Sequence, residues 1–207
     1  MSVNMNHSHV PPLKSQGAIS KEGEVLTATP NEKPYTIAEI EALPEDQRAE
    51  LIDGDLYMLA TPSRIHQRIS MWLSNAILDH IKNSRKECEV FAAPFGVYIG
   101  GAEDSYNYVE PDISVICDKT KLTDKGCIGA PDWIIEIVSP SSIQKDYYHK
   151  LFLYRTAGVR EYWIIDPDKQ KVRTYLFGDF STGDYSFEDS IPVGISDSLQ
   201  IRISDLI

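Results

Sequence analysis

The sequence predicts an α/β (α+β) domain in which helices flank a mixed central sheet. One long segment repeats apolar residues at helical spacing, and several short apolar runs bounded by glycine, proline or aspartate have the composition of strands. Their order is helix, strands, helix, strand and then further strands, without an internal repeat. This order favours a mixed sheet with extra C-terminal antiparallel strands over a regular doubly wound fold.

The composition indicates one core preceded by a tail. Of the 207 residues, 42% are hydrophobic and 25% are charged, as in an ordinary globular protein. Residues 1–33 contain few large apolar side chains, so we predict a flexible N-terminal tail there and a single domain over residues 34–207. His7 and His9 lie in this tail without neighbours that would complete a metal site.

Local signals place the first helices. Thr36 is expected to begin a short helix, because Glu39 stands three residues later, where its side chain reaches the Thr36 amide. Pro44 interrupts this helix, and residues 45–51 are expected to form a second short one. The longest helix begins near residues 62–63. Its expected core face consists of Ile65, Ile69, Trp72, Leu73, Ala76, Ile77 and Ile81.

One more helix and eight strands are expected in the rest of the chain. The helix begins at Ser141 or Ser142 and ends at Gly158. The expected strands cover residues 56–60, 90–99, 108–116, 133–138, 161–165, 171–177, 184–188 and 199–203. Of these, 171–177 and 184–188 are expected to form an antiparallel pair.

The cysteines and the apolar segments bear on the cellular compartment. Cys88, Cys117 and Cys127 are an odd number without CxxC spacing, so we expect reduced packing residues rather than disulfides or a zinc site. No apolar segment has the length of a membrane span, and the N-terminus lacks the apolar run of a signal peptide. A cytoplasmic protein without a membrane partner is the expectation.

The charge balance opposes tight binding to nucleic acid. Lys and Arg total 20 against 31 Asp and Glu, which gives a net charge of -11. Proteins that bind phosphate backbones usually carry the opposite sign. Any affinity for DNA is therefore expected to be weak and sensitive to salt, or to depend on dimer geometry.

Two carboxylates occupy strand positions that are normally apolar. Because side chains alternate along a strand, Glu136 shares a face with Ile134 and Val138 in the middle of an apolar run. Asp112 follows Pro111 near the core of another expected strand. A divalent cation between the two acids would keep both ionised, and oxygen ligands favour Mg²⁺, with Mn²⁺ as a substitute, over Zn²⁺.

Each acid also has a purely structural interpretation. Asp112 would accept backbone hydrogen bonds at the entry to a strand. Glu136 would form a buried ion pair with one Lys or Arg. The two acids together, rather than either alone, indicate a metal site.

The segments around these acids resemble a known family. Pro111-Asp112 and 136–138 resemble the PD-(D/E)XK signature of restriction-endonuclease-like nucleases. From residue 34 to the C-terminus, the chain resembles the Uma-type endonucleases, a large bacterial family of that superfamily. The motifs concerned are ELIDGDL at 50–56, His66, EPD at 110–112, EIVSPSS at 136–142, Asp146, Lys150, Tyr154 and GVREYW at 158–163. The resemblance implies a restriction-endonuclease-like fold.

The resemblance also assigns a lysine to the site. Val138 stands where the superfamily motif has a lysine, and the family implies Lys150 on the following helix as its replacement. Asp146, Lys150 and Tyr154 are four residues apart and share one helix face, so Lys150 would point toward the strand of Glu136. A surface ion pair between Lys150 and Asp146 is the alternative.

Two further residues are candidates by resemblance. Glu50 corresponds to an acid that relatives contribute from an N-terminal helix, which implies a metal ligand, direct or through water. The alternative is a solvated helix residue. His66, in the first turn of the long helix, is a candidate phosphate contact and otherwise a capping or surface group.

Together these residues predict a metal-dependent endonuclease that hydrolyses phosphodiester bonds in DNA. Asp112, Glu136 and the carbonyl of Ile137 would hold the cation, and Lys150 would orient or deprotonate water. The resemblance also implies a homodimer. A catalytically weak or inactive binding or assembly module is the alternative, favoured by Val138 and the acidic charge. A hydrolase of a small phosphate compound is a third hypothesis.

Overall fold

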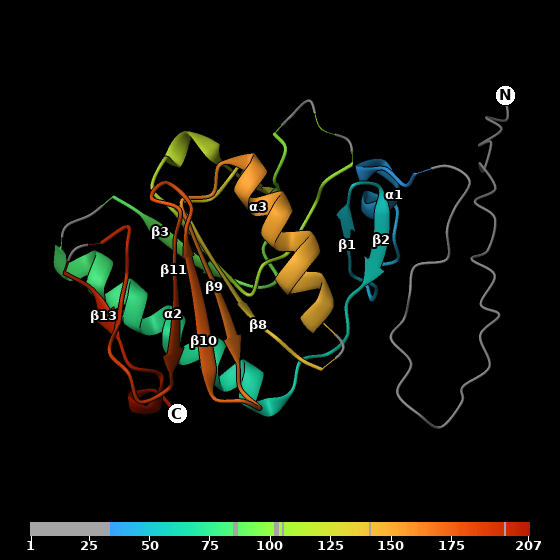
Figure 1. Ribbon diagram of the computed structural model, residues 1–207. Helices are drawn as coiled ribbons and strands as arrows, with labels where there is room; N and C mark the ends of the chain where they lie inside the picture. The colour runs from blue at the N-terminus through green and yellow to red at the C-terminus, as the bar shows by residue number, and fades with distance from the viewer. Residues whose placement is uncertain (1–33, 85–86, 102–103, 105, 141, 197) are drawn as a thin grey trace, which may run out of the picture.

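A six-stranded sheet with helices on both faces forms the centre of the molecule (Figure 1). This computed structural model describes residues 34–84, 87–101, 104, 106–140, 142–196 and 198–207. The strand order is β11-β10-β9-β8-β5-β3. Only β8 and β9 are parallel, and the other neighbours are antiparallel. The predicted mixed sheet is confirmed.

The strands of the central sheet are β3 (Glu89–Ala92), β5 (Ile113–Ile116), β8 (Trp133–Ile137), β9 (Glu161–Asp166), β10 (Lys171–Leu176) and β11 (Ser181–Ser186). Smaller sheets contain β1 (Ala49–Ile52) with β2 (Asp55–Met58), β4 (Val97–Tyr98) with β7 (Gly126–Ile128) and β6 (Leu122–Thr123), and β12 (Ile191–Pro192) with β13 (Gln200–Ile201). The helices are α1 (Ile37–Glu41), α2 (Arg64–Ser84) and α3 (Leu151–Ala157), with short turns η1 (Lys119–Lys121), η2 (Lys145–Lys150) and η3 (Ile203–Asp205).

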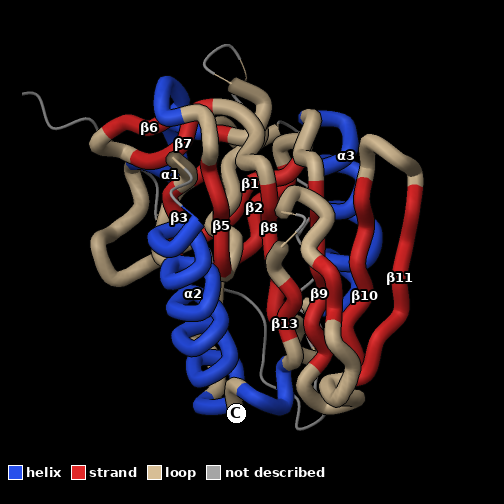
Figure 2. The backbone as a smooth tube through the Cα atoms, turned by 90° about the vertical axis from the view of Figure 1, so that its left-hand side faces the viewer, coloured by secondary structure: helices blue, strands red, loops and turns tan. Residues whose placement is uncertain are grey.

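Alternating side chains on the central strands separate two apolar cores. Trp133 and Ile135 face α2, whereas Ile134 and Val138 face α3 and the β1-β2 hairpin. Figure 2 shows α2 and α3 on opposite sides of the sheet. Glu136 therefore lies on the α3 side, as the alternation predicted.

Helix α2 has the expected core stripe, with two exceptions. Its fully buried apolar residues are Ile69, Leu73, Ile77 and Ile81. Ile65 and Trp72, which the periodicity assigned to the same face, are 36% and 45% exposed. The buried residues are four apart, and Trp72 lies beside that stripe, whereas Ile65 continues it in the first turn of the helix, where it is exposed.

The N-terminal part is only partly as predicted. The Thr36 amide donates to Glu39 Oε2 at 2.8 Å, so the helix cap is confirmed. The helix expected over 45–51 is wrong, because β1 begins at Ala49 and pairs with β2. Asp53 and Gly54 adopt positive φ angles of 51° and 84°, which suit a two-residue hairpin turn. That hairpin overrides the local helical preference.

Two expected strands are shorter than predicted. Residues 90–99 form β3 and β4, which lie in different sheets. Pro94 lies between them and has no amide hydrogen for a sheet ladder. The segment 108–116 enters the central sheet only at Ile113, because Tyr108 and Val109 bridge to other strands.

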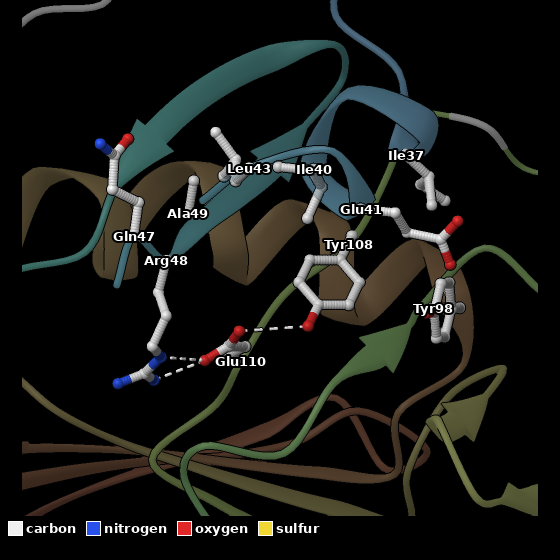
Figure 3. Close-up of a pocket in the computed structure, with 10 residues that line it drawn as sticks. All are labelled: Ile37, Ile40, Glu41, Leu43, Gln47, Arg48, Ala49, Tyr98, Tyr108 and Glu110. Atoms are coloured by element: carbon white, nitrogen blue, oxygen red, sulfur yellow. Dashed lines mark hydrogen bonds and ion pairs between the residues drawn. The ribbon is translucent and has the colours of Figure 1, made fainter. Parts of the chain in front are cut away.

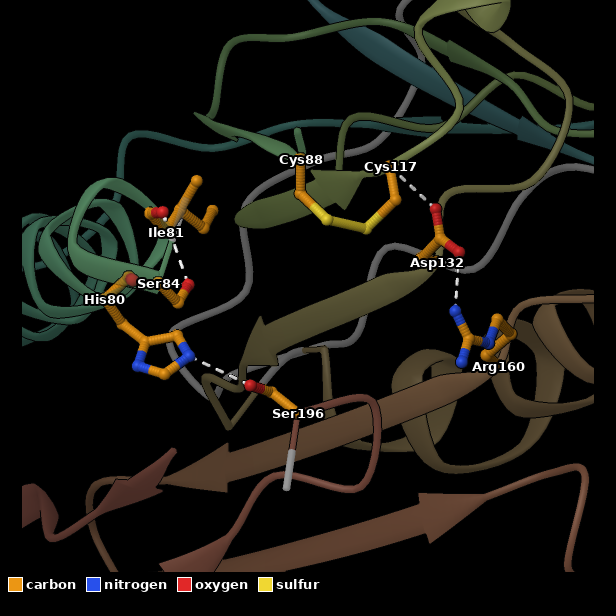
Figure 4. Close-up of a disulfide and its surroundings, with 8 residues drawn as sticks. All are labelled: His80, Ile81, Ser84, Cys88, Cys117, Asp132, Arg160 and Ser196. Atoms are coloured by element: carbon orange, nitrogen blue, oxygen red, sulfur yellow. Dashed lines mark hydrogen bonds and ion pairs between the residues drawn. A yellow bond between two sulfur atoms is a disulfide. The ribbon is translucent and has the colours of Figure 1, made fainter. Parts of the chain in front are cut away.

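A disulfide between Cys88 and Cys117 corrects the expectation of three reduced cysteines (Figure 4). Glu89 pairs with Ile116 across β3 and β5, so the next position along the register places the two cysteines opposite each other. Cys127 is free and buried, as expected. Odd cysteine counts do not exclude one pair, and sequence spacing does not reveal strand register.

Two expectations remain, one about the N-terminal tail and one about membrane-spanning helices. The tail predicted for residues 1–33, with His7 and His9, lies outside the described residues. Within the described ranges, no helix has both the length and the apolar character needed to cross a membrane.

Candidate active site

Glu136 and Lys150 form the centre of a buried polar cluster on the α3 side of the sheet. Glu136 is in the middle of β8, and Lys150 ends the π-helix η2. The Lys150 Nζ donates to Glu136 Oε1 at 2.7 Å, and the Tyr154 hydroxyl donates to the same oxygen at 2.7 Å. The face shared by Lys150 and Tyr154 thus points toward Glu136, as the spacing predicted.

Glu50 joins this cluster from β1 rather than from a helix, which corrects the expected location. Its side chain is fully buried, so it is not a solvated residue. Lys150 Nζ lies 2.7 Å from Glu50 Oε1, and Lys145 Nζ lies 2.6 Å from Oε2. The amide of Glu110 also donates to Oε1 at 3.1 Å. Glu50 therefore holds both lysines in place.

Asp112 lies immediately before β5, opposite Glu136 in the antiparallel register of β5 and β8. Its Oδ2 accepts a hydrogen bond from the Ile137 amide at 2.7 Å. His66 Nε2 lies 3.0 Å from the same oxygen. His66 Nδ1 is buried and makes no hydrogen bond within the described part of the chain. His66 thus supports Asp112 instead of capping the helix or facing solvent.

The expected structural roles are also present. Asp112 does accept a backbone hydrogen bond, and Glu136 does form a buried ion pair. The alternative for Lys150, a surface ion pair with Asp146, is not observed. Its Nζ is 3.7 Å from Asp146, but the side chain is only 3% exposed and its closer partners are glutamates. Val138, in place of the motif lysine, is buried in the apolar core beside α3.

Acidic groups outnumber basic groups in the cluster. Its carboxylates are Glu50, Asp112, Glu136 and Asp146, and its ammonium groups are Lys145 and Lys150. The pKa of Glu136 is raised to about 8. Burial is the main cause and neighbouring carboxylates add to it, whereas Lys150 opposes it. The site therefore has a deficit of positive charge around Glu136.

The pKa of Glu50 is lowered and the pKa of Lys150 is raised, for different reasons. Burial alone would raise the pKa of Glu50, but Lys150 and Lys145 lower it to about 2. Burial opposes charge on Lys150 too, yet Glu136 and Glu50 hold its pKa well above the usual value. Glu50 differs from Glu136 because it has a second lysine. The two glutamates therefore favour the ammonium form of Lys150.

The donors present are oxygens, which hard divalent cations prefer. Within the described ranges, no three His, Cys, Asp or Glu side chains form a complete metal site. Mg²⁺ usually binds through one or two carboxylates, keeps several waters and takes further oxygens from a substrate phosphate. Asp112, Glu136 and the Ile137 carbonyl supply such hard oxygen ligands, and the raised pKa of Glu136 marks the place where positive charge is lacking.

Lys145 belongs to the buried polar cluster, although the sequence did not predict it. In an α-helix, residues five apart point in different directions, but the wider π-helix brings Lys145 and Lys150 to the same side. Both consequently reach Glu50. The sequence carries no signal for this winding, so only the structure identifies Lys145.

The mixed sheet has a restriction-endonuclease-like fold, with an aspartate at one strand, a glutamate on the next and a lysine from the following helix. The chain belongs to the Uma2 family: residues 37–193 match the family model described as "Putative restriction endonuclease".

One solved structure and two curated proteins are similar to this chain. A crystal structure of a "putative nuclease belonging to DUF820" from Anabaena variabilis superposes with a TM-score of 0.68 at 27% identity, over 84% of this chain and 97% of that chain. The uncharacterized protein sll1609 of Synechocystis is 28% identical over 68% of this chain and 85% of its own length. A second Synechocystis protein, slr1290, is 26% identical over 62% of this chain and 66% of its own length.

Proposed function

We propose that this protein is a magnesium-dependent endonuclease that hydrolyses phosphodiester bonds in DNA. The observation that carries the proposal is the buried pair Glu136–Lys150 beside Asp112, with more carboxylates than ammonium groups around it. The nuclease family and the nuclease neighbour agree with this class of activity.

Asp112, Glu136 and the carbonyl of Ile137 would hold the cation, with Glu50 as a ligand only through water because two lysines occupy its oxygens. Such a cation, when bound, lowers the pKa of water and offsets charge on phosphate oxygens.

Lys150 supplies a fixed positive charge. Its raised pKa supports stabilisation of charge on the phosphate, and the orientation of water, over removal of a proton. Tyr154 keeps Glu136 oriented through its hydroxyl, and His66 does the same for Asp112. The role of His66 in this proposal is therefore to position a metal ligand, in place of the expected phosphate contact.

Cleavage of supercoiled plasmid and of single-stranded DNA with Mg²⁺ or Mn²⁺ tests the proposal. Asp112→Ala and Glu136→Ala should lose cleavage, and so should the wild type in a chelator. Asp184→Ala is the matched control, because this carboxylate pairs with Arg173 on the β10–β11 hairpin. Equal cleavage by all three variants would overturn this site.

The acidic surface limits the mode of DNA binding. With a net charge of -11, we propose that binding is weak at high salt and that a homodimer presents two sites to duplex DNA. Light scattering measures the oligomeric state, and a salt series in filter binding measures the affinity. Tight binding that does not change with salt would contradict this part.

Two observations favour an inactive binding or assembly module instead. Every carboxylate of the cluster that Mg²⁺ would use already has a partner within the chain, and Val138 replaces the motif lysine. Measuring the melting temperature while Mg²⁺ is added distinguishes the nuclease from the inactive module. The melting temperature of an inactive module should not rise with Mg²⁺.

A further inference from the structure

A cavity of about 160 Å³ lies beside the candidate active site (Figure 3). Its apolar wall is formed by Ile40, Leu43 and the ring of Tyr108. Arg48 and Glu110 form its polar end, where Figure 3 shows them joined to each other. The catalytic carboxylates are not part of its lining, so it is a separate feature of the surface.

The polar end is fixed by hydrogen bonds. Arg48 Nε donates to Glu110 Oε2 at 2.8 Å, and Arg48 Nη2 contacts the same oxygen. The Tyr108 hydroxyl donates to Oε1 at 3.1 Å. Burial and Glu110 raise the pKa of Tyr108, so its hydroxyl stays a donor. The Glu110 side chain is 9% exposed and both its oxygens are hydrogen-bonded, whereas that of Arg48 is 40% exposed, which leaves guanidinium donors open.

One backbone segment connects the cavity with the active site. Glu110 turns its carboxylate to Arg48, while its amide donates to Glu50. Asp112 follows two residues later, so the Cα atoms of Glu110 and Asp112 are at most about 7 Å apart. The short segment 110–112 therefore belongs both to the cavity wall and to the candidate metal site.

Size and chemistry restrict the ligand class. The volume of about 160 Å³ is well below the range of roughly 300–1,000 Å³ that is usual for small-molecule pockets, so it holds one ring system only. Apolar walls suit a flat ring. The open donors of Arg48 complement the ring-nitrogen and carbonyl acceptors on the edge of a nucleobase.

We propose that this cavity binds one unpaired nucleobase of the nucleic-acid substrate and thereby places the neighbouring phosphodiester at Asp112 and Glu136. The placement of the phosphodiester rests on the proposed function, whereas base binding does not. A base stacked within a duplex does not reach such a cavity, so the substrate strand is single-stranded or locally unpaired there.

Direct binding tests the cavity without any activity. The probes are the four deoxynucleosides, titrated into the whole protein and followed by NMR shifts. Wild type and the matched control Arg173→Ala, which breaks a guanidinium–carboxylate pair on the far hairpin, should bind at least one of them. Arg48→Ala should bind at least tenfold more weakly, and Leu43→Trp, which fills the cavity and keeps Arg48, should do the same. Absence of binding to wild type, or unchanged binding by both variants, overturns the proposal.

Cleavage separates this inference from the proposed function. In a single-stranded oligonucleotide with one abasic position, the wild-type protein should not cleave the phosphodiester next to that position. Asp112→Ala should bind deoxynucleosides but not cleave. Nucleoside binding without any DNA cleavage retains the cavity and refutes the nuclease, whereas cleavage that ignores the abasic position refutes the cavity.

Discussion

Lys150 Nζ lies 2.7 Å from Glu136 Oε1, and the same ammonium is 2.7 Å from Glu50 Oε1. One cation thus serves two buried carboxylates on strands of different sheets. This shared dependence ties the β1–β2 hairpin to the central sheet and makes Lys150 important for folding as well as for the proposed chemistry.

Replacing Lys150 by methionine should lower the free energy of unfolding by about 3–5 kcal/mol, because Glu136 would remain buried without its cation and Glu50 would keep only Lys145. Urea denaturation in a chelator measures the loss. Adding Glu136→Gln to Lys150→Met should recover part of it, since the two changes act on one network. Lys125→Met is the control, because Lys125 and its partner Glu41 are 74% and 47% exposed, and it should change stability little. Wild-type stability of Lys150→Met would refute the arrangement.

Replacing His66 by alanine should weaken Mg²⁺ binding by about 10–100-fold, because residues that orient a metal ligand typically have effects of that size. His66 Nε2 contacts Asp112 and would no longer fix the carboxylate. Isothermal titration with MgCl₂ measures the affinity. His80→Ala, on the same helix but bonded to Ser196, supplies the control. An unchanged affinity in His66→Ala would show that Asp112 needs no support or binds no metal.

Reducing the disulfide should destabilise the protein. Cys88 and Cys117 are 29 residues apart, and closing a loop of that length removes enough chain entropy from the unfolded state to contribute about 3–4 kcal/mol. Urea denaturation with and without a phosphine reductant measures this, and Cys88→Ser with Cys117→Ser should be insensitive to the reductant. A wild-type midpoint that does not move in reductant would mean that the thiols are not paired.

The sequence could predict the features that depend on local periodicity. The buried stripe of α2, the apolar strand β8 with Glu136 on its own face, and the stop at Gly158 all follow from residue spacing. The helix face that carries Lys150 was predictable for the same reason, although the family resemblance was needed to choose it.

Features that depend on distant pairing were not predictable. Residues 45–51 have good local helix formers, but pairing with β2 decides their structure. Cys88 meets Cys117 only through the register of β3 and β5. Lys145 enters the site because η2 winds as a π-helix. In each case the deciding energy is tertiary and leaves no mark in a short stretch of sequence.

Glu161 gives a prediction about pH that is independent of the metal site. Burial raises the pKa of Glu161 above 4.5, although the amides of Gly194 and Ile195 and the indole of Trp163 donate to its carboxylate. Because the pKa is raised in the folded state, the contribution of Glu161 to the free energy of unfolding is fully present below pH 4.5. It is lost as the pH rises through the pKa that Glu161 has in the folded protein.

Glu161→Gln removes this titration but leaves a buried amide group facing N–H donors. The variant should therefore be about 1–3 kcal/mol less stable than wild type at pH 4, and the difference should narrow as the pH is raised, since only wild type loses stability from this group. Urea denaturation of both proteins from pH 4 to 8 measures the difference. A gap that stays constant, or widens with pH, would mean that Glu161 does not titrate above its ordinary value in the folded protein.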